Sequence, residues 1–339
     1  MLLCTKSSCL RSCEYLSQDE RVFINNAIVS LPPSTKILDP DTKRQIEIKS
    51  VTKTSSILVE IPIEFDTIGI IDGQHRLFAY HEGNDSFEAN IAAKRLKQQL
   101  LVTGVVYPPG ITDDQQREFE ARLFLEINDK QTKTRPDLRQ AIEAIVNPYS
   151  VIAIAKAVIN RISANGPLCG ILEEHQFDRG KLKSSSIVSY GLKHVVKVEG
   201  LDTLFTLWKH SEKDALAEAV DAASKGRKKF KTPSKTALID YIDFCARKIN
   251  DVLVGYRTAV GHDMWTVDRK KSRALTTTGV NGVIFCIRRL VENGKITTVD
   301  EYKKAFPKMT QDFKPSGFKF KSSHWRELGD RIFKQCFQD

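Results

Sequence analysis

The stretch IIDGQHRLFAY, residues 70–80, carries a glycine and four hydrogen-bonding side chains directly after an apolar run: Asp72, Gly73, Gln74, His75 and Arg76. Where a strand ends and a helix begins, a glycine allows a tight turn and a close approach of a ligand to the backbone. The unpaired N–H groups of the first helical turn then form an anion site. An arginine beside them can grip a phosphate through two parallel hydrogen bonds. The pattern therefore predicts phosphate binding by residues 73–76.

The same residues could also carry catalysis. We expect Asp72 to orient a water molecule or a metal ion, and we expect His75 and Arg76 to bind phosphates and to stabilise developing charge. Gln74 can donate and accept, so it could contact a base or a sugar. A structural alternative stays open, in which Asp72 only caps a helix and His75 is a structural histidine. In that case Arg76 would pair with a carboxylate such as Glu82.

A second polar stretch, FLEINDKQTKTRPDL, covers residues 124–138 at the expected end of a helix. Oxygen ligands suit a divalent cation such as Mg²⁺, and we expect Glu126 and Asn128 to hold it. Further candidates for nucleotide contacts are Asn128, Gln131 and Thr132. The alternative is a polar connector between two helices, with Asn128 as its C-cap.

The chain carries a net charge of +10, and its basic residues are concentrated in runs. One run is KGRKKFKTPSK (225–235) and another is DRKKSR (268–273), with Lys314, Lys319 and Lys321 further along. Such runs attract polyanions, of which nucleic acid is the commonest. The residues expected to contact DNA are Lys225, Arg227, Lys228, Lys229, Lys231, Lys270 and Lys271. A solvated loop is the alternative for any single run.

Hydrophobic periodicity predicts an α+β domain followed by a largely helical region. Strands are expected over residues 57–63, 67–71 and 99–107. Helices are expected over 19–30, 74–82, from the N-cap Thr112 onward, and over 136–146. Later helices are expected over 150–164, 184–196, 200–224, 235–259, 279–293 and 324–337. We therefore expect two domains, residues 15–147 and 148–339.

The cysteines and the hydropathy of the chain indicate the cellular compartment in which it works. No pair among the seven cysteines has the C-x-x-C spacing of a zinc site or redox motif. An odd number of cysteines in a chain of this length favours reduced thiols in a cytoplasm. Cys4, Cys9 and Cys13 could bind a metal only with a distant histidine. No apolar run approaches the roughly 18 residues of a membrane span, and the first residues are too short and polar for a secretory signal. We therefore expect a cytoplasmic protein without a membrane partner.

The stretch IDGQHRLFA, together with the later FLEINDKQTKTRPDL, resembles the DGQHR-domain family, which includes the DndB proteins of DNA phosphorothioation and the DpdB proteins of 7-deazaguanine DNA modification. The resemblance extends over residues 15–295 and is strong at 66–80 and 119–140. It implies a mixed α/β core like that of the ParB/sulfiredoxin superfamily, with a helical C-terminal half. Position 74 is a reactive cysteine in sulfiredoxins, and Gln74 excludes that chemistry here.

The resemblance to the ParB boxes assigns roles to both stretches. Residues 73–76 would take the place of the box that grips nucleotide phosphates. Glu126, Asn128 and Gln131 resemble the later box that supports the metal and the phosphates, with inserted residues between them.

The family implies a protein that binds and hydrolyses ATP, or another nucleoside triphosphate, with Mg²⁺. It would work on DNA in a bacterial modification and phage-defence system, beside a transglycosylase-like or sulfur-transfer enzyme, and it could form a homo-oligomer. Extracting a base from a duplex costs a few kcal/mol, so coupling to ATP would make physical sense. One alternative is a DndB-like DNA-binding transcriptional regulator without turnover, although no clear helix-turn-helix supports it. The other is a small-molecule kinase on a ParB-like fold.

Overall fold

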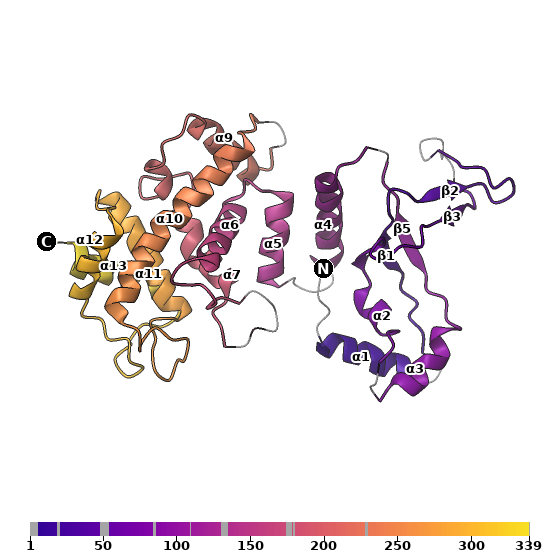
Figure 1. The fold of residues 1–339 in the computed structure, drawn as a ribbon, viewed down its shortest axis with the longest axis horizontal. Coiled ribbons are helices and arrows are strands. Elements are labelled where there is room, and N and C mark those ends of the chain that lie inside the picture. Colours follow the sequence, from indigo (N-terminus) through magenta and orange to yellow (C-terminus); the bar gives the residue numbers. More distant parts are fainter. Residues whose placement is uncertain are drawn as a thin grey trace. The chain divides into compact units, whose positions relative to one another are not determined.

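The chain forms two compact units in the computed structural model, Met1–Lys133 and Thr134–Asp339 (Figure 1). Their elements are mixed helix and strand, with small sheets in the first unit and helices in the second, so the fold class is α+β as expected. The structure describes residues 6–18, 21–47, 54–83, 86–108, 110–129, 135–173, 178, 180–227 and 230–338. Each unit is described below by itself.

A three-stranded sheet lies at the centre of unit 1. Strand β1 (Ala27–Ser30) runs between β4 (Gly69–Asp72), which is antiparallel to it, and β5 (Val102–Val105), which is parallel. The β1–β4 ladder pairs Ile28 with Asp72 but Val29 with Ile70, so Ile71 is an extra residue in β4. Such bulges bend a strand and re-aim the residues beside them. This one immediately precedes the turn at residues 72–76, Asp-Gly-Gln-His-Arg, which we call the signature.

Helices flank this sheet in sequence and supply most of the small core of unit 1. They are α1 (Lys6–Ser17), α2 (Gln74–Phe78), α3 (Glu88–Arg95) and α4 (Asp113–Asp129). The residues buried between the first three helices are Cys13, Leu16, Ala79 and Ile91. Strands β2 (Lys36–Leu38) and β3 (Leu58–Glu60) form a separate antiparallel pair, held at one end by an ion pair between Lys36 and Glu60.

Side chains satisfy the backbone groups at two helix ends of unit 1. The ammonium of Lys94 donates to the carbonyl oxygens of Leu16 and Gln18, each at 2.6 Å, and so occupies orphan acceptors after the last turn of α1. Thr112 is the N-cap expected for α4. Its hydroxyl accepts from the backbone N–H of Gln115, whose side chain accepts from the N–H of Thr112 in return. Helix α4 therefore begins where the sequence predicts.

Unit 2 is built around a large helical core. Its principal helices are α5 (Pro136–Val146), α6 (Val151–Ala164), α9 (Lys213–Ser224), α10 (Lys235–Val260), α11 (Thr277–Glu292), α12 (Val299–Ala305) and α13 (Trp325–Phe337). Shorter helical turns are α7 (Ser184–Ile187), the π-helix η2 (Val188–Leu192), α8 (Lys193–Val195), and the 3-10 turns η3 (Leu204–Thr206) and η4 (Phe306–Lys308). The expected apolar stripe of α10 is buried, including Tyr241, Ile249 and Tyr256.

Most expected elements are confirmed, and the differences have physical causes. The helix expected over 19–30 is wrong, because Ala27–Ser30 is the central strand and gains backbone partners on both sides. Its β-branched Ile28 and Val29 suit a strand. The helix expected over 200–224 is confined to Lys213–Ser224, after a 3-10 turn.

The boundary between the units lies earlier than the expected position after residue 147. Helix α5 belongs to unit 2, because the amide of Gln140 donates to the carbonyl of Ser185 and to the hydroxyl of Ser189. Gln140 is 5% exposed, so these bonds hold α5 firmly within that core.

No single helix in the described part of the chain is both long and apolar enough to cross a membrane. Helices α5 and α6 together meet the length and composition of a span, but they are bent by 108° at the break between them. The apolar face of α6 is buried in the core of unit 2, through Ile154, Ala155, Val158, Ile159 and Ile162.

The Gly73→Ala substitution should destabilise unit 1 more than Gly110→Ala. Both glycines have a left-handed φ, 90° and 85°, so both substitutions carry backbone strain of about 1 kcal/mol. A Cβ at Gly73 would also lie 3.0 Å from the Cα of Ala27, whereas a Cβ at Gly110 meets nothing within 4 Å. We expect an additional loss of about 1–3 kcal/mol for Gly73→Ala, measured by chemical denaturation. Equal losses would show that the close approach to β1 has no energetic role.

Candidate functional site

The signature turn joins β4 to α2 through Gly73, as the sequence predicts. Gly73 is the N-cap of α2 with φ 90° and ψ 8°, and no side chain caps the helix. Asp72 is therefore not the N-cap of the structural alternative. The carbonyl of Gly73 accepts from the N–H groups of both Arg76 and Leu77, which closes the turn.

Helix α2 is shorter than the anion site predicted at its start requires. Helix α2 has only five residues, so few peptide dipoles add up along its axis. Two of the amide groups of residues 74–77 are already used by the carbonyl of Gly73. An anion here would have to be held by side chains, and the side chain best placed for this is Arg76.

Arg76 connects the signature to the start of β1. Its Nη2 donates to the carbonyl oxygen of Asn26 at 2.8 Å and to the Asp72 carboxylate at 3.1 Å. The ion pair is partly buried, with 23% of the Arg76 side chain and 22% of the Asp72 side chain exposed. The alternative partner, Glu82, is not used. Nε is buried, and neither it nor Nη1 has a hydrogen-bond partner among the residues that the structure describes.

His75 lies in a mixed electrostatic environment. Burial lowers the pKa of its imidazole from the ordinary 6.5, Asp72 opposes that shift, and the positive charges of Arg76 and Arg11 add to it. The ring is therefore neutral at pH 7. Arg11 belongs to α1. Because its charge lowers the pKa of His75, the N-terminal helix must lie close to the signature.

A cavity of about 330 Å³ lies beside Arg76 in unit 1. Its lining comes from α1, from the segment before β1 and from the signature: Arg11, Ser12, Tyr15, Val22, Phe23, Ile24, Asn25 and Arg76. The rings of Tyr15 and Phe23 stack with centroids 5.5 Å apart and planes at 25°. The guanidinium of Arg21 lies 5.5 Å from the centroid of the Tyr15 ring. Arginines and stacked rings thus surround one cavity, which we call the Arg76 cavity.

Sequence reasoning missed the contribution of α1 to this cavity. Arg11 and Tyr15 are four residues apart, the spacing that puts two side chains on one face of a helix. That spacing was the available signal, but the segment is polar and its helix was not expected. The approach of α1 to the signature is a tertiary contact that periodicity cannot predict.

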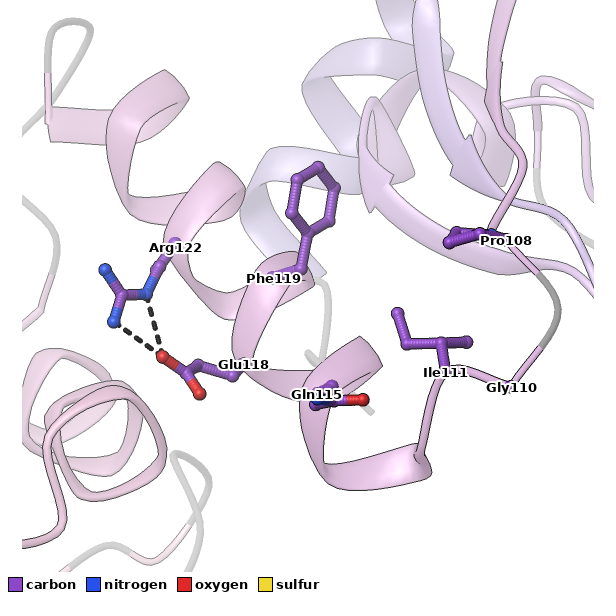
Figure 2. Close-up of a pocket in the computed structure, with 7 residues that line it drawn as sticks. All are labelled: Pro108, Gly110, Ile111, Gln115, Glu118, Phe119 and Arg122. Carbon is purple, nitrogen blue, oxygen red and sulfur yellow. Dashed lines mark hydrogen bonds and ion pairs between the residues drawn. The ribbon is translucent and has the colours of Figure 1, made fainter. Parts of the chain in front are cut away.

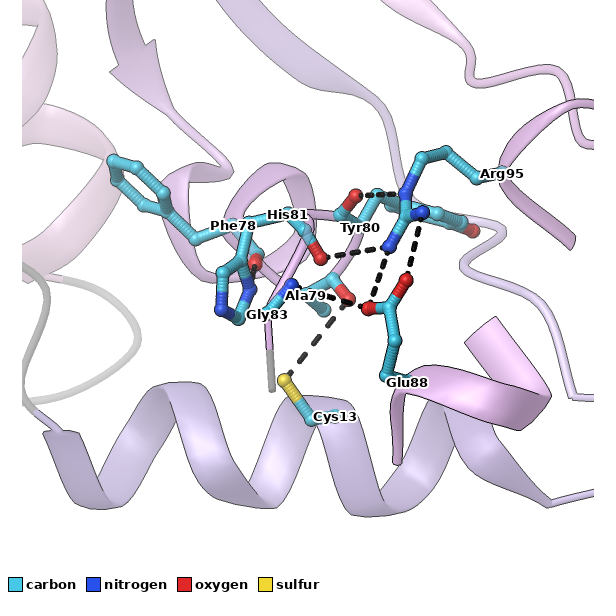
Figure 3. Close-up of polar contacts among 8 residues, drawn as sticks. All are labelled: Cys13, Phe78, Ala79, Tyr80, His81, Gly83, Glu88 and Arg95. Atoms are coloured by element: carbon cyan, nitrogen blue, oxygen red, sulfur yellow. Dashed lines mark hydrogen bonds and ion pairs between the residues drawn. The ribbon is translucent and has the colours of Figure 1, made fainter. Parts of the chain in front are cut away.

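The loop after α2 is fixed on one side by Arg95 of α3 (Figure 3). Its Nε donates to the carbonyl of Tyr80, Nη2 donates to the carbonyl of His81, and two further bonds reach the Glu88 carboxylate at 2.9 and 3.1 Å. Arg95 holds the pKa of that carboxyl below its ordinary value. On the other side, the thiol of Cys13 points at the carbonyl of Ala79. The loop after α2 is therefore held by both α1 and α3.

The structure does not bring together Glu126 and Asn128, the two residues of the second stretch that were expected to hold Mg²⁺. Glu126 and Asn128 are two residues apart on α4, and side chains at that spacing do not face each other. Glu126 is exposed, and the amide of Asn128 donates to the carbonyl of Phe124, in its own helix. Among the described residues no three potential histidine, cysteine or carboxylate ligands gather around a point. The predicted residues Gln131 and Thr132 lie outside the described part of the chain.

A larger cavity of unit 1 lies elsewhere, between the loop after β5 and helix α4 (Figure 2). It has a volume of about 590 Å³, and no predicted site residue lines it. Pro108, Ile111 and Phe119 form its apolar side. Glu118 and Arg122 pair with each other at its edge, at 2.5 Å. Its lining offers one arginine, which is paired with Glu118, and one aromatic ring, whereas the Arg76 cavity offers two arginines and a stacked pair of rings.

The basic run 225–235 is partly neutralised. Lys225 and Arg227 both form ion pairs with Asp221, at 2.7 and 2.5 Å. Lys231 is exposed, and the predicted residues Lys228 and Lys229 lie outside the described part of the chain. The two described cations nearest α9 are thus less available to DNA than the sequence predicts.

The second basic run remains open to solvent. Lys270 and Lys271 are exposed, and neither forms an ion pair with a residue that the structure describes. The N–H of Arg273 donates to the carbonyl of Phe313, which joins this turn to a later basic segment. The exposed lysines of that segment are Lys314, Lys319 and Lys321. Two runs that are far apart in sequence therefore adjoin in unit 2.

Comparisons of the chain with protein families, curated proteins and solved structures find no match.

The pKa of His75 should respond in opposite directions to its two neighbours. Arg11→Gln removes a positive charge and should raise the pKa, whereas Asp72→Asn removes a negative charge and should lower it. The measurement is an NMR titration of the imidazole C–H signals, assigned with His75→Gln. If the pKa of His75 is the same in Arg11→Gln as in the unaltered chain, α1 does not lie against the signature.

Proposed function

We propose that unit 1 is a ParB-like, DGQHR-type core that binds a nucleoside triphosphate in the Arg76 cavity, and that the chain hydrolyses it while working on DNA. The observation that carries this proposal is the meeting of Arg76 and Arg11 with the Tyr15–Phe23 ring pair around one cavity. Guanidinium groups suit phosphates, and aromatic faces suit a base. A nucleotide combines both chemistries in one ligand.

The proposed division of work follows from the contacts of each side chain. Two donors of Arg76, Nε and Nη1, have no partner among the described residues, and its bonds to Asn26 and Asp72 fix the plane of the guanidinium. Holding that plane beforehand reduces the entropy lost when a phosphate binds. Arg11 supplies a second cation from α1, and Asp72 orients Arg76. The residues expected to hold Mg²⁺ do not fit a shared ion, so no step is assigned to protein-bound metal.

Hydrolysis requires a water molecule to attack the γ-phosphorus as the bond to the leaving diphosphate breaks. Negative charge spreads over the phosphoryl oxygens in the transition state, where the positive charges of Arg76 and Arg11 would stabilise it. His75 is neutral at pH 7 and can accept a hydrogen bond from that water. In the proposed role, the energy released serves a cytoplasmic DNA-modifying partner enzyme of the transglycosylase or sulfur-transfer type. The alternative is a regulator that senses nucleotide without turnover.

Binding of a fluorescent ATP analogue should weaken by roughly 10–100-fold in Arg76→Gln, because one charged hydrogen-bonding group is lost. Arg11→Gln should also weaken binding, and it alters a helix surface position without disturbing the turn. Tyr15→Ala should weaken binding of the analogue but leave displacement by inorganic tripolyphosphate unchanged, since tripolyphosphate has no base. Arg122→Gln is the matched control, because it removes an exposed arginine of unit 1 outside the Arg76 cavity.

Phosphate release from ATP, with and without Mg²⁺ and DNA, separates the enzyme from the regulator. Release that is lost in Asp72→Asn and Arg76→Gln supports hydrolysis at this site. Binding without release would favour the DndB-like regulator. Unchanged nucleotide affinity in both Arg11→Gln and Arg76→Gln would overturn the proposed site.

A further inference from the structure

A second cationic and aromatic cluster lies in unit 2, around His194 of α8. The imidazole of His194 stacks on the indole of Trp325, with ring centroids 6.0 Å apart and planes at 27°. The guanidinium of Arg326 lies 5.0 Å from the centroid of the same indole. Phe285 of α11 packs edge-on against Trp325 at 5.5 Å. Trp325 is 7% exposed, so it forms a buried base on which His194 and Arg326 are positioned.

The cations of this cluster differ in whether they have acidic partners. Arg288 forms an ion pair with Asp202. Lys193, Lys197 and Arg326 form no ion pair with any residue that the structure describes. Lys193 and Lys197 are half-buried, and Arg326 is exposed. A folded chain that keeps three neighbouring cations without a counter-charge has a positive potential there, which an external anion would relieve.

The electrostatic state of His194 reports that potential. Burial lowers the pKa of the imidazole, and the surrounding cations lower it further, to about 4. The charged groups that face the ring are Lys193, Lys197, Arg326, and Arg288 with its partner Asp202. His194 is therefore neutral at pH 7, and protonating it would add a charge to an already positive site.

The backbone before His194 is unusual. Residues 188–192 form a π-helical turn, a rare conformation that is frequent at functional sites. Tyr190 lies in that turn and is 55% exposed. Tyr190, Lys193, His194 and Lys197 keep some exposure, whereas Gly191, Leu192, Val195 and Val196 between them are buried, so the first four lie on the outer side of this segment. An exposed aromatic ring thus accompanies the unpaired cations.

We propose that the surface formed by Tyr190, Lys193, His194, Lys197 and Arg326, here called the His194 surface, binds single-stranded DNA. The three unpaired cations hold successive phosphates, and Tyr190 stacks on a base. Cations interleaved with an exposed ring favour a single strand, because the bases of a duplex are already stacked on each other. An acidic polypeptide would use the cations but not the ring. The inference rests on the proposed function only in taking DNA as the polyanion.

The test is fluorescence anisotropy of the full chain with a labelled oligothymidylate, over a series of salt concentrations. The triple variant Lys193→Gln, Lys197→Gln, Arg326→Gln should bind roughly tenfold or more weakly. Its slope of log affinity against log salt should fall by about 2, since each lost phosphate contact removes about 0.7. Tyr190→Ala should weaken binding roughly tenfold with little change in the salt slope, because stacking releases no counterions.

The matched control removes the same number of charges from the basic run 225–235, with Lys225→Gln, Arg227→Gln and Lys231→Gln. We expect affinity close to that of the unaltered chain, because Lys225 and Arg227 are already paired with Asp221. Loss of binding in this control, with none in the His194 triple variant, would overturn the proposal. Equal affinity for the duplex of the same sequence, or for polyglutamate, would also overturn it.

The pKa of His194 provides a readout that a merely structural role would not change. Bound phosphates add negative potential, so the pKa measured by NMR should rise when the oligonucleotide is added. An unchanged pKa with saturating oligonucleotide would place the DNA elsewhere. Failure of the nucleotide site is distinguishable, because it would appear as lost ATP binding in unit 1 with this surface still active.

Discussion

The arrangement of unit 1 depends on one close approach, between the signature turn and the start of β1. Gly73 lies against the backbone of Ala27, and Arg76 reaches past it to the carbonyl of Asn26. A side chain at position 73 would separate the two, and a shorter residue at 76 would not span the distance. The same guanidinium that fastens the turn also lines the Arg76 cavity. Structural and ligand-binding roles therefore share one side chain.

Sharing of this kind makes the site stiff. Arg76 is held by Asn26 and Asp72, and the loop after it is held by Arg95 and by the thiol of Cys13. Few of these bonds are local in sequence, so the geometry forms only when α1, α3 and β1 are all in place. A pocket assembled this way presents its donors with little freedom left to lose on binding. The cost is that damage to one support affects the others.

The turn at Gly73 was predictable from sequence because its chemistry is local, and Gly73 adopts the left-handed conformation that the pattern requires. Helices α4, α5 and α10 were predictable too, and each begins within a residue of its expected start. The contribution of α1 was not predictable, since Arg11 meets the signature only through tertiary packing. Asp221 likewise neutralises part of a basic run that sequence treats as free. Glu126 and Asn128 were expected to share a metal ion, but they lie two residues apart on α4 and therefore do not face each other.

The bulge in β4 has a consequence for chain length rather than for composition. Ile71 is the extra residue that lets Asp72 and Ile70 both find partners on β1. Deleting Ile71 would make the ladder regular while Asp72 kept its place opposite Ile28, but it would remove the local bend that aims the turn after β4. We therefore expect a single-codon deletion there to change the direction of the turn, and with it the position of Arg76, although Ile71 itself does not line the Arg76 cavity.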